Sequence, residues 1–137
     1  MTTKTKNILR WIALLPACAF SAGIMVAIIN VLFASAGIDG YEGVSIISNA
    51  VMTYVILEVA FLVAPKKVLG ISIIGGLLLM VNLLQFFTIT SHPFIDPEDV
   101  VMSLISFLLI YVILMFYFIY RAVGEEKRPK TFSNEKK

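Results

Sequence analysis

The chain has 137 residues, of which 59% are hydrophobic and 15% charged, and its mean hydropathy is +0.93. A soluble domain is about 45–50% apolar and about 25% charged, so this composition excludes both a soluble globular domain and a chain that is disordered throughout. The formal net charge of +2 reflects where the basic residues lie along the chain and gives no reason to expect nucleic-acid binding.

Four apolar segments follow one another along the chain. A membrane β-barrel would show polar and apolar residues alternating over about ten positions, and runs such as LLIYVILMFYFIY show no alternation. The sequence therefore predicts an all-α membrane protein whose four transmembrane helices form two hairpins, joined by a tight Pro65-Lys66-Lys67 link. The predicted spans are residues 11–36, 45–64, 68–90 and 100–120, each reaching the roughly 20 residues that a helix needs to cross a bilayer.

Basic residues lie on one side of the predicted spans. All eleven Lys and Arg fall in residues 1–10, in the link between the second and third spans, or after residue 120. The two loops on the other side hold five acidic residues and no basic one. Because cytoplasmic loops are enriched in Lys and Arg, we expect both termini in the cytoplasm and the bundle, residues 11–123, in a bacterial inner (plasma) membrane. The polar tail, residues 124–137, is expected to be disordered.

The loop from His92 to Asp99 contains one histidine and three carboxylates, a combination that suggests a metal site. A helix start explains these residues better, because Asp96 suits the N-cap and Pro97 the first helical position. Glu98 and Asp99 then fall in the first turn, where they meet the positive end of the helix dipole. No His or Cys spacing elsewhere resembles a zinc site. The sequence therefore predicts no metal and no cofactor.

Polar side chains from all four spans lie at a similar depth, toward the outer ends of the helices. In hydrocarbon such groups need partners, which favours an arrangement in which they face one another across the bundle. Small residues on the same helical face, such as Gly23 and Ala27 of the first span, would allow close packing. Packing contacts are one interpretation, and the lining of a small outward-facing polar cavity is the other. The predicted polar cluster comprises Asn30, Asn49, Asn82, Gln85, Ser103 and Ser106.

Glu58 is the only formally charged residue inside the four apolar segments. Inserting an acidic side chain near the centre of a membrane helix costs about 2.5–3.5 kcal/mol, so such a residue is a candidate functional site. At about 100° per residue, Glu58 and Asn49 fall on opposite faces of the second span, and Tyr54 shares the Glu58 face. The candidate partners are a second copy, another protein, or the side chains of Ser21, Ser72 and Tyr117.

The sequence contains no glycine-rich phosphate loop, nucleophile elbow, HExxH or CxxC motif, and the loops between its spans are shorter than about ten residues. We therefore expect a membrane protein that is not an enzyme. The favoured hypothesis is helix–helix association in the lipid bilayer, with a second copy in a homo-oligomer or with a larger membrane-protein partner, through the face that holds Glu58 and Tyr54. The alternative is a small transporter or channel, with Glu58 as an intramembrane protonatable site and the polar cluster lining the path.

Overall fold

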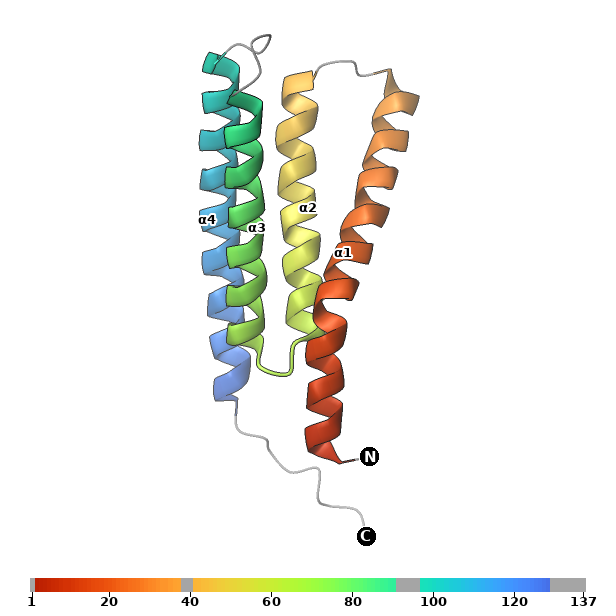
Figure 1. Ribbon diagram of the computed structural model, residues 1–137, viewed down its shortest axis with the longest axis vertical. Helices are drawn as coiled ribbons and strands as arrows, with labels where there is room; N and C mark the ends of the chain where they lie inside the picture. The colour runs from red at the N-terminus through yellow and green to blue at the C-terminus, as the bar shows by residue number, and fades with distance from the viewer. Residues whose placement is uncertain (1, 38–40, 91–96, 129–137) are drawn as a thin grey trace.

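The computed structural model describes residues 2–37, 41–90 and 97–128, and within these ranges every regular element is an α-helix (Figure 1). The side chains of residues 41–45, 89–90, 97 and 99–100 fall outside the description. Each helix is long and apolar enough to cross a membrane, which confirms the predicted all-α fold with four membrane-spanning helices. The helices are α1 (Thr3–Ala36), α2 (Tyr41–Val63), α3 (Lys67–Thr90) and α4 (Pro97–Lys127).

Successive helices run in opposite directions, so the start of α1, the α2–α3 connection and the end of α4 lie at the same end of the bundle (Figure 1). We call this the linked end, and we call the opposite end, where α1 leads to α2 and α3 leads to α4, the open end. α2 packs against each of the other three helices, and α3 packs against α4. α2 is therefore the central helix of the bundle.

The helices extend beyond the predicted spans wherever polar residues continue a helical segment. α1 begins at Thr3 instead of Trp11, and α4 continues to Lys127 instead of ending at Tyr120. Lys, Arg and Glu are good helix formers, so a helix that leaves the membrane continues through them. α4 begins at Pro97, as predicted, whereas Asp96 and most of the polar tail lie outside the described residues.

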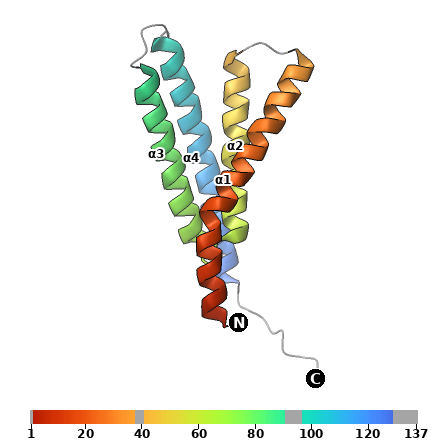
Figure 2. The same ribbon diagram turned by 45° about the vertical axis from the view of Figure 1, so that its right-hand side comes forward.

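The apolar core lies toward the linked end. One buried cluster joins Leu14 and Cys18 of α1 to residues of α2 and α3, and a second joins residues of α2 and α3 to Phe118 of α4. Among the described side chains of the open half, Ile29 and Phe107 are the buried ones. Figures 1 and 2 show the reason, because the helices spread apart toward the open end.

Gly70 allows the closest approach between α3 and the end of α2. A Cβ atom built on Gly70 would lie 2.2 Å from Cβ of Ala64 and 3.8 Å from the carbonyl oxygen of Ala60. The Ala64 methyl group is attached to the backbone and has no rotamer by which it can withdraw. Only a residue without a side chain therefore fits at position 70. The same test at Gly76, two turns further along α3, meets no atom within 4 Å.

Gly70→Ala is expected to lower the melting temperature of the purified protein in detergent, because overpacking of this kind costs about 1–3 kcal/mol. Gly76→Ala is the matched control, since it makes the same change in the same helix without a neighbour to displace. Alanine is favoured over glycine in a helix by about 1 kcal/mol, so the control should be neutral or slightly stabilising. Equal shifts in the two variants would contradict the close approach at Gly70.

Candidate functional site

Glu58 of α2 forms an ion pair with Arg121 of α4. The distance from Nη1 of Arg121 to Oε2 of Glu58 is 2.7 Å, as expected for a charge-assisted hydrogen bond. The side chain of Glu58 is 27% exposed and that of Arg121 is 34% exposed, so much of each is covered by neighbouring helices. Both residues lie near the last two turns of their helices, and α2 and α4 run in the same direction, so the pair sits at the linked end.

Phe61, one turn after Glu58, also contacts the guanidinium group of Arg121. The Cζ atom of Arg121 lies 4.2 Å from the centre of the Phe61 ring, within the range of a cation–π interaction. Phe61 is 2% exposed and its ring lies 6.5 Å from that of Phe118 on α4. The guanidinium group therefore contacts both a carboxylate and an aromatic face that belong to α2.

Charged side chains also satisfy the backbone at the C-terminal end of α2. The Lys67 ammonium group donates to the carbonyl oxygen of Phe61 and, at 3.4 Å, to that of Leu62. Arg10 of α1 donates from Nη2 to the same Leu62 oxygen at 3.2 Å. The last carbonyl groups of a helix have no partners within the helix and carry partial negative charge, so cations stabilise them.

The N-terminal end of α3 receives the opposite charge. The backbone N–H of Val68 donates to Oε1 of Glu126, a residue of α4, at 3.2 Å. A carboxylate at a helix N-terminus satisfies a free N–H group and interacts favourably with the helix dipole. The short connection between Val63 and Lys67 is thus stabilised on both sides by side chains from other helices.

Arg121 was not among the partners expected for Glu58. The Ser21 and Ser72 hydroxyl groups instead donate to carbonyl groups of their own helices, those of Cys18 and Val68. Tyr54 packs its ring 5.5 Å from that of Phe118, so the Glu58 and Tyr54 face of α2 is turned toward α4 of the same chain. Arg121 follows the predicted fourth span and so was expected outside the membrane, although a guanidinium on a long side chain can reach back along its helix.

Tyr117, the remaining candidate partner, packs its ring edge-on against Phe118 at 5.1 Å. The sequence did contain a signal for the true partner. Arg121 directly follows the apolar run of the fourth span, and Glu58 lies about one and a half turns from the same membrane boundary. Matching an intramembrane acid with the basic residues at the nearest span ends would have selected Arg121 together with few others.

The predicted polar cluster is not joined into one network. Asn82 donates to the carbonyl oxygen of Leu78 at 2.8 Å, and Ser106 donates to that of Met102 at 2.9 Å, both within one helix. Asn30 and Gln85 are exposed, and Asn49 and Ser103 are half-buried. In the part of the chain that the structure describes, no hydrogen bond joins any two of the six side chains, and α1 diverges from α3 and α4 toward the open end (Figure 2).

The described residues contain no group of three or more His, Cys, Asp or Glu side chains able to hold a metal ion. The loop residues His92 and Asp96, which were considered as metal ligands, lie outside the described ranges. The structure therefore offers an ion pair between two helices at the linked end and, in the open half, amide groups that have no partners from neighbouring helices among the described residues.

Glu58→Gln and Arg121→Gln are each expected to lower the melting temperature by a few degrees, because each leaves a charge without its counter-charge. The double substitution should cost less than the sum of the single ones, which is the signature of a direct interaction. Lys66→Gln is a suitable control, since Lys66 is an exposed basic residue of the same end. Strictly additive losses would contradict a direct Glu58–Arg121 interaction.

Comparisons with protein-family models, with curated proteins and with solved structures found no match for this chain. Its function is therefore inferred from the geometry of its own residues.

Proposed function

We propose that this small polytopic membrane protein is not an enzyme and acts by helix–helix association in the bilayer, with a second copy of itself or with a larger membrane protein. The observation that supports this proposal is that two amide side chains in the open half are exposed and have no hydrogen-bond partner among the described residues. Asn30 and Gln85 are exposed on helices α1 and α3, and neither has a hydrogen-bond partner among the described residues. A partner helix would supply the hydrogen bonds that the described part of the chain does not.

The cost of leaving such groups unpaired supports association. An amide placed in an apolar medium without a hydrogen bond loses several kcal/mol relative to water by transfer measurements, or about 1–3 kcal/mol by mutational ones. Asparagine and glutamine each present both a donor and an acceptor, so the same surface on two copies is chemically self-complementary. Interhelical hydrogen bonds of polar side chains in membranes are a known source of such association.

The distribution of packing supports the same surface. The linked half contains both buried core clusters, whereas the open half contributes few buried side chains. The association face that we propose is therefore the open half of the bundle, in place of the Glu58 and Tyr54 face that the sequence favoured. Glu58 belongs to the internal support of the bundle in this proposal, because its carboxylate is engaged by Arg121.

In the orientation that we propose, the protein lies in a bacterial inner membrane and its linked end faces the cytoplasm. Eight of the described Lys and Arg residues lie at this end, together with three glutamates. Such an excess of basic residues is typical of the cytoplasmic side. The open half, with its amide groups, then lies toward the outer leaflet.

To test this proposal, the oligomeric mass of the purified protein is measured in nanodiscs for the wild type and for the variants Asn30→Leu and Gln85→Leu. We expect the wild type to be an oligomer, and each substitution to weaken its association. Interhelical hydrogen bonds in membranes contribute about 0.6–1.7 kcal/mol each, so the association constant should fall by about 3- to 15-fold per substitution.

Asn82→Leu is the matched control, because Asn82 already donates to its own helix and so has less to gain from a partner. Glu58→Gln should lower thermal stability while leaving the oligomer assembled. A monomeric wild type that captures no membrane partner by crosslinking would refute association. A proton-dependent flux that vanishes in Glu58→Gln would favour the transporter alternative instead.

A further inference from the structure

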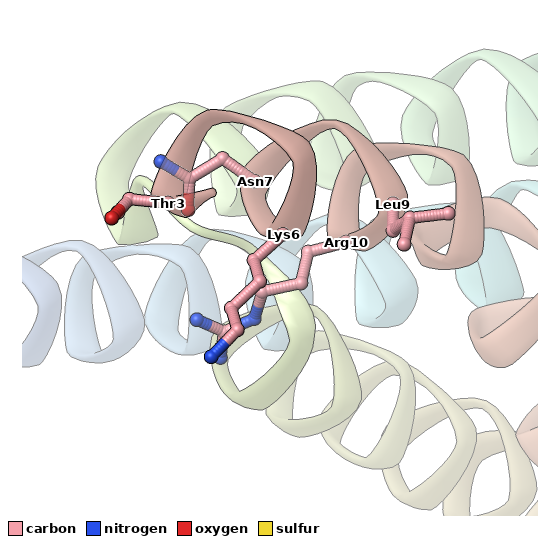
Figure 3. A pocket seen from close by; sticks show the side chains of 5 residues that line it. All are labelled: Thr3, Lys6, Asn7, Leu9 and Arg10. Atoms are coloured by element: carbon pink, nitrogen blue, oxygen red, sulfur yellow. The ribbon is translucent and has the colours of Figure 1, made fainter. Parts of the chain in front are cut away.

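The first turns of α1 form a basic depression at the linked end, separate from the open half. An open cavity of about 530 Å³ is lined by Thr3, Lys6, Asn7, Leu9 and Arg10. Figure 3 shows the Lys6 and Arg10 side chains pointing to the same side of α1. Two hydrogen-bonding side chains, two cations and one apolar side chain therefore surround one space.

The positive charge around this depression is not neutralised within the described part of the chain. Arg10 and Lys67 both donate to the carbonyl oxygen of Leu62, so two cations are held within 3.4 Å of one atom. Of the three glutamates at this end, Glu58 is paired with Arg121 and Glu126 accepts from the Val68 N–H. Lys6 and Arg10 form no ion pair within the described residues, so an anion from outside would meet two unpaired positive charges.

The residues beside the depression indicate which kind of anion it can bind. Trp11 follows Arg10 directly and packs against the core cluster of α1, α2 and α3, and tryptophan is enriched at the boundary between hydrocarbon and headgroups. Ile8 and Leu9 are 51% and 48% exposed, so apolar side chains lie beside the cations. A ligand that carries a phosphate next to an apolar chain fits both features, and a free inorganic anion fits only the first.

We propose that this depression binds the headgroup of an anionic phospholipid from the leaflet at the linked end, with Lys6 and Arg10 on the phosphate and Leu9 beside the glycerol and acyl region. Arg10 bridges this lipid and the end of α2 through its hydrogen bond to Leu62. The site differs from the association surface of the open half, and neither depends on the other.

Trp11 is the only tryptophan of the chain and lies next to Arg10, so its fluorescence reports lipid at this site. The protein is placed in phosphatidylcholine vesicles in which an equal fraction of lipid is either brominated phosphatidylglycerol or brominated phosphatidylcholine. We expect stronger quenching by the anionic lipid. Lys6→Gln should reduce this preference by about fivefold, as estimated for one basic residue at a charged membrane surface.

Lys4→Gln is the matched control, because it removes the same charge from the same helix but Lys4 does not line the depression. It should retain the preference. The Lys6 side chain forms no hydrogen bond among the described residues, so Lys6→Gln should fold normally, and circular dichroism checks this. Arg10→Gln should also lose the preference.

Three results would overturn the proposal. Equal quenching by the two brominated lipids in the wild type would show that no anionic site exists beside Trp11. An equal loss in Lys4→Gln and Lys6→Gln would show diffuse attraction to a charged surface instead of a site. Loss of the preference when chloride is replaced by inorganic phosphate at constant ionic strength would assign the depression to free phosphate.

Discussion

A carboxylate inside an apolar helix needs a counter-charge, and this requirement fixes the arrangement of α2 and α4. Glu58 meets it with Arg121 at 2.7 Å, and the guanidinium group in turn rests on Phe61. The ion pair forms only when α4 lies alongside α2 at one height and one rotation. An apolar contact would tolerate sliding by a residue, whereas a short ion pair with a stacked ring does not. The glutamate in the run of apolar residues therefore specifies how two helices meet.

The same end of the bundle also shows how a short connection between membrane helices is stabilised. The connection from α2 to α3 leaves carbonyl groups on one side and N–H groups on the other without partners in their own helices. Lys67 and Arg10 satisfy the carbonyl groups, and Glu126 satisfies an N–H group. Lys67 and Arg10 therefore tie the end of α2 to α3 and α1, and Glu126 ties the start of α3 to α4. Gly70 allows the backbone to approach closely enough for these contacts.

The number and approximate extent of the helices followed from the sequence, because spans of about 20 apolar residues and a Pro97 helix start are local signals. The contacts between helices did not follow. Hydropathy ended the fourth span at Tyr120 and so assigned Arg121 to water, although the side chain turns back toward Glu58. The positions of the amides along their helices put them at a similar depth in the membrane. Whether their side chains contact one another depends on the angles at which the helices cross. One sequence does not encode that crossing in any local pattern, and the observed divergence separates Asn30 from Gln85.

The two halves of the bundle therefore differ in how far their polar side chains find partners within the described part of the chain. At the linked end, the acidic side chains of Glu58 and Glu126 find partners within the chain, and the cations of Lys6 and Arg10 remain in excess. In the open half, the amides of Asn30 and Gln85 find none within the described residues. Regions with few buried contacts open at the lowest free energy, so the open half can adjust to a partner helix while the ion pair keeps the linked end intact. Anchoring at one end is what makes adaptation at the other compatible with a stable fold.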